Sequence, residues 1–262
     1  MIVAKYGGHV LENAAADDDI VATLAQYHSD GGELVVVHGG GPAVDKELDI
    51  HGIETTMASG YRITTSEVMQ IVQQTLSGHV LRNLTNQFIK HGVNAVGLSS
   101  GDGRTLRARK YSPVVDGIQV DAGLVGEAQS VDATFLRLLL SKNYLPIVSP
   151  VSVSESGEAM NLNGDIATGS IAGALAAEEV LFITDVAGIY RNWPDESSLI
   201  SEISLSELQS LAPTFAGGMA PKVKAVITAL TSGATQARVI DGRNISNLKR
   251  ALSGQGGTVI YS

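Results

Sequence analysis

The stretch LVVVHGGGPAVD, residues 34–45, joins a buried strand to a helix through three consecutive glycines. Residues 34–37 form a β-branched run that suits a strand, and Pro42 suits the first turn of a helix, where its missing N–H costs nothing. From this loop alone, two interpretations of residues 39–41 stay open. The glycines make a tight turn, since glycine reaches positive φ without steric cost, or their N–H groups face a bound anion.

The same strand-then-helix pattern recurs along the chain. Apolar runs that suit strands occupy residues 1–6, 33–38, 94–100, 145–151, 179–186 and 237–242. Helices are expected at residues 17–28, 42–51, 65–90, 132–142, 165–177, 204–211, 221–232 and 244–252, with Gly78 as the point where the long third helix would break. Thr64 followed by Glu67 indicates a capping box before that helix. The alternation predicts βαβ units and a mostly parallel sheet.

Two segments interrupt the alternation. Residues 103–127 and 150–165 carry turn residues between β-rich arms, which is typical of β-hairpins. We expect them to cover the ligand edge of the sheet as a lid. The chain shows no repeat and no linker, so a single domain is predicted, divided into an N-terminal lobe of residues 1–177 and a C-terminal lobe of residues 178–262.

Composition excludes several classes of protein. The 262 residues contain no cysteine, which excludes disulfides, thiolate catalysis and cysteine-based zinc sites. With no apolar segment of about 18 residues and no signal peptide, a cytoplasmic protein is predicted. A net charge of −9 and 5% aromatic residues argue against a nucleic-acid partner. The basic cluster at residues 104–110 is interpreted as a solvated hairpin strand.

Common catalytic motifs are absent or incomplete. There is no Gly-Lys dipeptide for a Walker A loop, and Val44 stands where a dinucleotide fingerprint needs glycine or alanine. GLSSG at residues 97–101 matches a nucleophile elbow, but all six histidines precede Ser99, whereas that class of hydrolase needs a later one. No two histidines are spaced as in a helix-borne zinc motif, and His38 is interpreted as a polar structural residue.

Charged and glycine-rich sequences remain at several strand ends. Lys5 ends the first strand, and Lys222 stands in the first turn of a helix, where the helix dipole disfavours a lysine unless an anion is bound. Asp165 opens another helix, where N-capping is a sufficient explanation, and Asp185 and Gly188 follow a further strand. Each has a structural explanation by itself. Together at one sheet edge they favour a cleft that handles phosphate.

Eight motifs carry a resemblance to a known family: KYGGH, VVVHGGGP, GYRIT, AVGLSSGDG, GLVGE, NLNGD, TDVAGIY and GGMAPKV, in this order between residues 5 and 223. Together they resemble the amino acid kinase family, and within it the members that phosphorylate N-acetyl-L-glutamate. The resemblance implies a three-layer αβα sandwich with a central, mostly parallel sheet of about eight strands and β-hairpin lid elements. It also implies ATP-dependent transfer to the side-chain carboxylate in arginine biosynthesis, with Mg²⁺ held mainly by phosphates.

The resemblance also assigns roles to individual residues. Lys5 and Lys222 would neutralise charge on the transferring phosphoryl group, and Asp165 would hold both lysines in place. N-acetylglutamate would be bound in the N-terminal lobe by Gly40, Gly41, Arg62 and Asn161. ATP would be bound mainly by the C-terminal lobe, and the residues implied are Gly7, Gly8, Asp185, Val186, Ala187, Gly188, Ile189, Tyr190, Thr214, Phe215, Ala216 and Met219. No side chain is implied as a metal ligand, and a homodimer is expected through the N-terminal lobe.

The chemistry agrees with these residue types. A glutamate side chain has a pKa of about 4.3 and is already ionised near pH 7, so the acceptor needs no general base. The barrier is repulsion between anions, which lysines, backbone N–H groups and Mg²⁺ would reduce. The planar fork of Arg62 suits a substrate carboxylate. Residues 39–41 are therefore interpreted as backbone donors near the substrate.

Some positions depart from the family pattern. Gly164 stands where the family usually has alanine, Ser100 where glycine is usual, and GHVLRNL at residues 78–84 replaces a more typical GKVNKEL. The last departure leaves dimer contacts and fine substrate choice open. The chain starts at its first strand, without the N-terminal helix of arginine-inhibited hexamers, so a dimer with little arginine inhibition is expected.

Two alternative functions stay open. One is a related kinase that acts on aminoadipate or glutamate linked to a carrier protein, although Arg62 favours a free substrate with an α-carboxylate. The other is a non-catalytic sensor of amino acid or nucleotide, against which the retention of Lys5, Asp165 and Lys222 argues. Carbamate kinase and aspartokinase share the fold, but Arg62 and Asn161 favour an acetylated amino acid.

Overall fold

An eight-stranded sheet forms the centre of the molecule. The computed structural model describes residues 1–7, 14–115, 117–215 and 217–262. The strand order is β14 (Glu202–Ser204), β16 (Thr258–Tyr261), β15 (Gln236–Asp241), β13 (Glu179–Thr184), β1 (Ile2–Tyr6), β2 (Leu34–His38), β10 (Leu145–Ser149) and β5 (Ala95–Ser99). Only the pairing of β16 with β15 is antiparallel among these described strands. The predicted mostly parallel sheet is confirmed.

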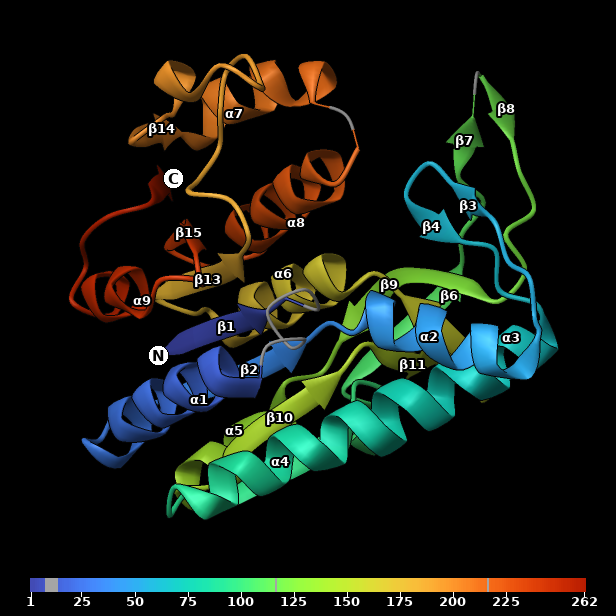
Figure 1. Ribbon diagram of the computed structural model, residues 1–262, viewed down its shortest axis with the longest axis horizontal. Coiled ribbons are helices and arrows are strands. Elements are labelled where there is room, and N and C mark those ends of the chain that lie inside the picture. Colours follow the sequence, from blue (N-terminus) through green and yellow to red (C-terminus); the bar gives the residue numbers. More distant parts are fainter. Residues whose placement is uncertain (8–13, 116, 216) are drawn as a thin grey trace.

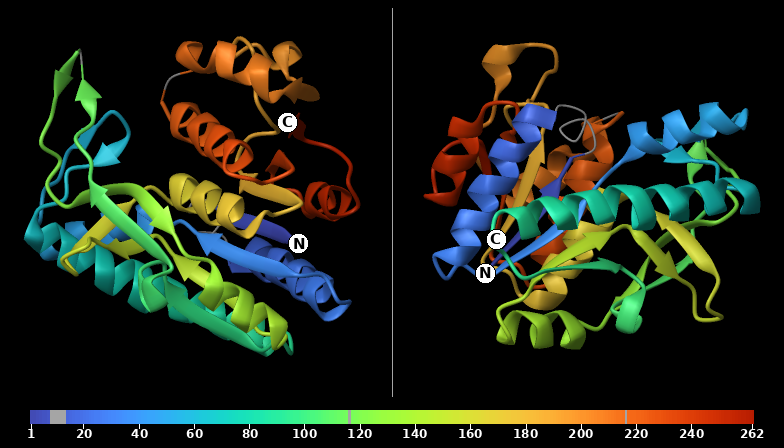
Figure 2. Two further views of the ribbon diagram at one scale, coloured as in Figure 1. Left: turned by 180° about the vertical axis from the view of Figure 1, so that it is seen from behind. Right: turned by 60° about the horizontal axis from the view of Figure 1, so that its bottom comes forward.

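Helices cover both faces of this sheet, which gives three layers (Figures 1 and 2). One face packs against α1 (Ala14–Ser29), α4 (Leu81–Lys90) and α9 (Ile245–Leu252). The other packs against α5 (Thr134–Ser141), α6 (Gly164–Leu175), α7 (Leu205–Leu211) and α8 (Met219–Thr231). In β1, Ala4 packs in the core on the face covered by α1, α4 and α9, and Val3 packs in the core on the face covered by α5 to α8. Because side chains alternate along a strand, Lys5 is directed to the layer of α6 and α8.

The predicted helices are confirmed to within a few residues at their ends. The long third helix consists of α3 (Ser66–Val72), a π-helical segment η2 (Gln73–Val80) and α4, so Gly78 lies inside a continuous helix instead of breaking it. The expected capping box is wrong by one residue. Thr65 is the N-cap, and its hydroxyl accepts a hydrogen bond from the Val68 N–H at 3.2 Å.

Both predicted hairpins are confirmed, and they join each other. β6 (Leu106–Lys110) pairs antiparallel with β9 (Val125–Val131), and β11 (Val151–Val153) with β12 (Ala159–Leu162). Parallel bridges between β11 and β6 and between β12 and β9 close a four-stranded barrel. Two short hairpins lie beside each other at one end (Figure 1), namely β3 (Met57–Ala58) with β4 (Tyr61–Arg62), and β7 (Val114–Val115) with β8 (Ile118–Gln119). The Ser59 hydroxyl joins them by donating to the Val114 carbonyl at 2.6 Å.

The remaining helices are α2 (Gly41–His51) and the 3₁₀ turns η3 (Asp102–Arg104), η4 (Glu196–Ser198) and η5 (Ala212–Thr214). β1 and β13 pair along their length, so one sheet runs through both predicted lobes, and the division at residues 177 and 178 stays a prediction. None of the described helices is long and apolar enough to cross a membrane.

The buried pair Glu179 and Arg238 yields a prediction about stability. Arg238 Nε lies 2.8 Å from Glu179 Oε1, and both side chains are less than 10% exposed. The change Glu179→Gln would leave the Arg238 charge buried without its counter-ion, so we expect a loss of about 3 kcal/mol in the free energy of unfolding, measured by urea denaturation. Glu178→Gln, at a carboxylate that is 83% exposed, is the control and should lose less than about 1 kcal/mol. An equal loss in both variants would contradict the prediction.

His38 at the end of β2 yields a prediction about pH dependence. The side chain is fully buried, and burial lowers its pKa from 6.5 to about 4, a shift that a hydrogen bond to the Gly39 carbonyl opposes and the Lys5 charge reinforces. A depressed histidine pKa stabilises the fold above pH 6.5, and the stabilisation is lost as the pH falls towards 4. Between pH 7 and pH 5, this one residue should remove about 2 kcal/mol from the free energy of unfolding.

The test compares urea denaturation of the wild type and of His38→Gln at pH 7 and pH 5. The variant should lose about 2 kcal/mol less than the wild type over this interval, because glutamine does not titrate. His79→Gln, at an exposed position, is the control. The same pH dependence in wild type and His38→Gln would contradict the prediction.

Candidate active site

Three elements bring two lysines to one carboxylate. Lys5 comes from β1, Asp165 from α6 and Lys222 from α8. Lys5 Nζ lies 3.0 Å from Asp165 Oδ1, and Lys222 Nζ lies 3.2 Å from Asp165 Oδ2. All three side chains are nearly buried, with exposures of 8–12%. The two lysines that the sequence placed at different strand and helix ends therefore meet in space.

The electrostatics of this cluster favour an additional anion. Burial by itself raises the pKa of Asp165, but the charges of Lys5 and Lys222 outweigh it and leave the pKa below its usual value. Burial lowers the pKa of Lys222, an effect that the Asp165 carboxylate opposes and the Lys5 charge reinforces. Two ammonium groups share one carboxylate, so one positive charge is in excess. A bound anion would compensate this charge.

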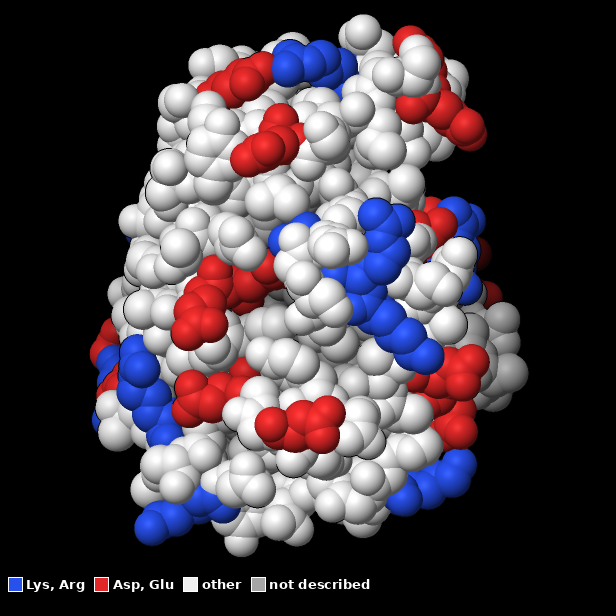
Figure 3. All heavy atoms as spheres, turned by 90° about the vertical axis from the view of Figure 1, so that its left-hand side faces the viewer, with Lys and Arg blue, Asp and Glu red and all other residues white. Residues whose placement is uncertain are grey.

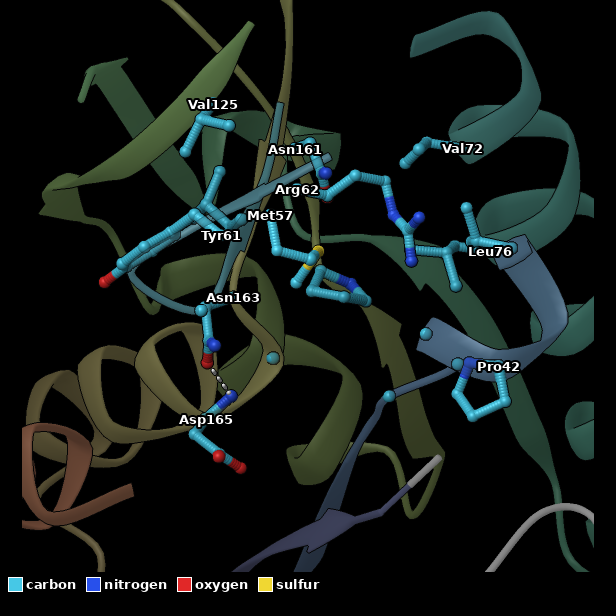
Figure 4. A pocket seen from close by; sticks show the side chains of 18 of the residues that line it. Pro42, Met57, Tyr61, Arg62, Val72, Leu76, Val125, Asn161, Asn163 and Asp165 are labelled. Carbon is cyan, nitrogen blue, oxygen red and sulfur yellow. Dashed lines mark hydrogen bonds between the residues drawn. The ribbon is translucent and has the colours of Figure 1, made fainter. Parts of the chain in front are cut away.

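Asp165 is available to the lysines because another residue caps its helix. The Asn163 side-chain oxygen accepts a hydrogen bond from the backbone N–H of Asp165 at 2.9 Å (Figure 4). It accepts a second from the N–H of Ile166 at 3.3 Å. The interpretation of Asp165 as an N-cap is therefore wrong. It is the second residue of α6, and its carboxylate is directed to Lys5 and Lys222 instead of the helix backbone.

A cavity of about 250 Å³ adjoins this cluster (Figure 4). Lys5 and Asp165 form part of its wall. All four predicted substrate residues, Gly40, Gly41, Arg62 and Asn161, also line it. Much of the remaining wall is apolar and comes from Met57, Val72, Leu76 and Val125. A wall of this mixed kind suits a small acid that carries an apolar group.

The glycine loop approaches the cavity closely, but its three residues are not equivalent. Gly40 has a φ of 147°, which residues with a side chain rarely adopt, and a Cβ atom there would also lie 2.6 Å from Leu76 Cδ2 and require that side chain to move. Gly41 begins α2, where the first N–H groups of a helix have no partner within it. Gly39 donates its N–H to the Tyr6 carbonyl at 2.8 Å. The expectation that all three glycines offer donors to a ligand is therefore wrong for Gly39.

Arg62 and Asn161 are held by two residues, Asp45 and Thr64, that no motif assigned to the substrate site. Arg62 Nη1 lies 2.6 Å from Asp45 Oδ1 of α2. Asn161 donates from Nδ2 to the Thr64 hydroxyl at 3.0 Å, and Thr64 donates in turn to the Arg62 carbonyl at 2.7 Å. Thr64 thus connects two predicted substrate residues. Its position two residues after Arg62 was visible in GYRIT, but the sequence pattern also resembled a helix cap.

Several predicted nucleotide residues follow strand ends beside Lys5. Gly7 follows β1 and donates its N–H to the Ile183 carbonyl at 3.2 Å, and a Cβ atom on Gly7 would lie only 2.9 Å from that oxygen. Residues 185–190 follow β13, which neighbours β1 in the sheet. The Asp185 charge acts to raise the pKa of Lys222, the smallest of several influences on that amine. The end of β13 is therefore close to the reactive cluster.

The remaining nucleotide predictions fall outside the cavity. Thr214 ends η5 and donates to the Leu211 carbonyl at 2.7 Å, whereas Phe215 and Met219 pack on the core near the start of α8. None of the described nucleotide residues lines the cavity that Arg62 and Asn161 share. Gly8 and Ala216 lie outside the described residues.

The GLSSG sequence and Gly164 have structural explanations. In GLSSG, the hydroxyls of Ser99 and Ser100 both donate to the Val151 carbonyl, at 2.6 and 2.9 Å, as in a structural turn. A Cβ atom on Gly164 would lie 3.4 Å from the nearest atom, the His38 carbonyl oxygen, so the usual alanine would fit.

Three of the four basic side chains in the cluster at residues 104–110 form ion pairs. The ion pairs are Arg107–Glu155, Arg109–Glu127 and Lys110–Asp121. On the face shown in Figure 3, groups of basic and acidic side chains likewise alternate.

Comparisons with known proteins agree with this geometry. The model of the amino acid kinase family matches residues 1–241. An acetylglutamate kinase of Streptomyces avermitilis is 41% identical over 247 residues, which is 92% of this chain and 80% of that protein. One of Corynebacterium glutamicum is 39% identical over 98% of this chain and 87% of its own length.

Solved structures share the fold. N-acetylglutamate synthase from Neisseria gonorrhoeae, complexed with coenzyme A and N-acetylglutamate, has a TM-score of 0.85 at 26% identity; the match covers all of this chain and 59% of that longer one. Carbamate kinase from Giardia has a TM-score of 0.73 at 18% identity, over all of this chain and 98% of that one. The chain therefore belongs to the amino acid kinase family.

Proposed function

We propose that this protein uses ATP to phosphorylate the side-chain carboxylate of N-acetyl-L-glutamate, giving an acyl phosphate, as a step of arginine biosynthesis. One observation carries the proposal. Lys5 and Lys222 converge on Asp165 at the wall of a cavity that Arg62 and Asn161 also line. The acetylglutamate kinases that are 39–41% identical to this chain support the choice of acceptor.

The cavity would hold the acceptor as an ion. Arg62 would bind the α-carboxylate through its planar fork, with Asp45 fixing one side of the guanidinium group. Asn161, oriented by Thr64, would bind the acetylated end. The side-chain carboxylate would then face Lys5, already ionised at neutral pH, so the reaction needs no general base.

Lys5 and Lys222 would stabilise the charge that develops on the phosphoryl group during transfer. They approach it from different elements, and Asp165 keeps both amines in position without neutralising them fully. Because both amines are already in place, they need not move when negative charge develops in the transition state. Electrostatic stabilisation by groups positioned in advance is usually the largest contribution to catalysis of this kind. Asp165 is therefore proposed as a positioning residue for the two lysines.

ATP would be bound beside this cluster, where the sheet edge fits a phosphate chain. At Gly7 and Gly188 a Cβ atom would meet the Ile183 carbonyl and the Thr258 hydroxyl, so glycine is required for the backbone to pack closely at this edge. Mg²⁺ bridging the phosphates would supply further positive charge. The described residues contain no cluster of three or more acidic or histidine side chains for a metal, so phosphate oxygens are proposed as its main ligands.

Two alternatives remain to be tested by experiment. A kinase for a carrier-linked substrate is disfavoured because Arg62 would lack an α-carboxylate to bind. A non-catalytic sensor is disfavoured because the Lys5–Asp165–Lys222 cluster is complete. A homodimer, a cytoplasmic location and weak arginine inhibition stay predictions.

The first prediction from this proposal concerns the two lysines. Lys5→Ala and Lys222→Ala should each lower kcat by about 100-fold or more, because removal of one group that stabilises transition-state charge typically has an effect of this size. The measurement is a hydroxamate assay for acyl phosphate with ATP and N-acetylglutamate. Lys142→Ala, at an exposed position on the end of α5, is the control. A kcat within a few-fold of wild type in either site variant would contradict the assigned role.

The second prediction concerns the acceptor. The same assay with N-acetylglutamate, aspartate, carbamate and carrier-linked aminoadipate should give product with N-acetylglutamate alone, because Arg62 and the apolar cavity wall together suit an acetylated α-amino acid. Product from another acceptor only would replace the proposed substrate. No product from any acceptor, together with nucleotide binding, would favour the sensor.

A further inference from the structure

Three side chains connect the acceptor cavity to helix α8. Tyr61 of β4 lines the cavity, and its ring centroid lies 4.9 Å from that of Tyr111, with the planes inclined at 52°. Lys224 Nζ of α8 lies 5.0 Å from the centroid of the Tyr111 ring, within the range of a cation–π interaction. The three residues come from separate parts of the sequence and form one continuous contact.

The first member of this connection, Tyr61, is next to Arg62 in the chain. The two side chains project from β4 in opposite directions, so that one strand supplies both a charged and an aromatic part of the cavity wall (Figure 4). Burial, with a smaller contribution from Tyr111, raises the pKa of Tyr61 to about 12. The ring therefore stays neutral at any pH at which the enzyme would work, and it extends the apolar wall that Met57 and Val125 begin.

Tyr111 is fixed to the same wall through its backbone. Its N–H donates to the Val125 carbonyl at 2.9 Å, and Val125 lines the cavity. The Tyr111 ring thus contacts both Tyr61 and Lys224. A displacement of Lys224 would leave the Tyr61–Tyr111 pair without support from α8.

The last member, Lys224, shares its helix with Lys222. Residues two apart on an α-helix are separated by about 200° around its axis. Lys222 is therefore directed to Asp165, while Lys224 is directed elsewhere and meets Tyr111. Through these two lysines, α8 contacts both the reactive cluster and the aromatic wall of the cavity.

We propose that Tyr61 determines acceptor binding by closing the apolar wall against the acyl group of the substrate, and that Lys224 positions it through Tyr111. Acceptor affinity then depends on the placement of α8, the same helix that brings Lys222 to the phosphoryl group. This inference rests on the proposed function and adds two residues, Tyr111 and Lys224, that do not touch the substrate.

Lys224 provides the sharpest test, because it is exposed and its substitution should leave the fold intact. Lys224→Met should raise the KM for N-acetylglutamate about two- to fivefold, the effect expected from an exposed cation–π contact, while the KM for ATP and kcat stay within twofold. Lys224→Arg should restore the wild-type KM, since a guanidinium group also binds the face of an aromatic ring. Lys142→Met is the matched control. A purely structural role would not produce this selective change or the rescue by arginine.

A double-mutant cycle with Tyr111 tests the route of the effect. Tyr111→Leu removes the ring, so adding Lys224→Met to it should change the KM for N-acetylglutamate by less than 1.5-fold. Tyr61→Ala should raise that KM about tenfold by opening the wall, whereas Tyr61→Phe should stay near wild type because the ring is kept.

The outcomes separate this inference from the proposed function. If the wild type makes acyl phosphate from N-acetylglutamate but Lys224→Met leaves its KM unchanged, only the role of Lys224 is overturned. Additive effects of Lys224→Met and Tyr111→Leu would overturn the route through Tyr111, and a wild-type KM in Tyr61→Ala would overturn the role of Tyr61. Absence of product in the wild type would overturn the proposed function and this inference with it.

Discussion

The Asp165 carboxylate, placed between two buried ammonium groups, is the interaction on which the rest of the site depends. Without it, Lys5 and Lys222 would repel each other in a region where water cannot screen them. Its position requires that β1, α6 and α8 pack correctly against one another. The cluster of Lys5, Asp165 and Lys222 therefore forms only when the core between the sheet and these helices is intact. The cluster keeps one positive charge in excess, which explains how a chain of net charge −9 can attract an anion. Distant surface carboxylates are screened beyond about 8 Å, and these amines act at contact distance.

Most of the fold could be predicted from periodicity. The six apolar runs form six strands of the eight-stranded sheet, the helices were located to within a few residues, and both hairpins formed. The two remaining strands of the sheet, β14 and β16, were missed because they are only three and four residues long, too short for an alternating pattern to be distinguished from a loop. The closing of the two hairpins into a barrel was also not predictable, because it depends on one residue pair between β11 and β6 and two between β12 and β9, strands that are far apart in sequence.

The site was predicted less evenly. The meeting of Lys5 with Lys222 was implied by family resemblance, since no spacing rule relates a strand end to a distant helix. The partners of short polar side chains were misjudged where a shift of one or two residues changes their role. Asn163 caps the helix for which N-capping by Asp165 was one of two interpretations, and Thr65 takes the place of Thr64, which instead orients Asn161. Tyr61 lies in GYRIT and Tyr111 follows the basic cluster, but nothing in either pattern indicates that the two rings meet, because their contact depends on the fold.

The placement of Lys5 within β1 limits how this chain can change. β1 pairs in parallel with both β2 and β13, so its register is fixed from two sides. Insertion or deletion of a single residue before Lys5 would turn its amine towards the opposite layer, among the side chains of α1 and α4, and would bring a neighbouring apolar residue to Asp165. The length of β1 is therefore fixed by its register, and homologues that keep both lysines should keep that length.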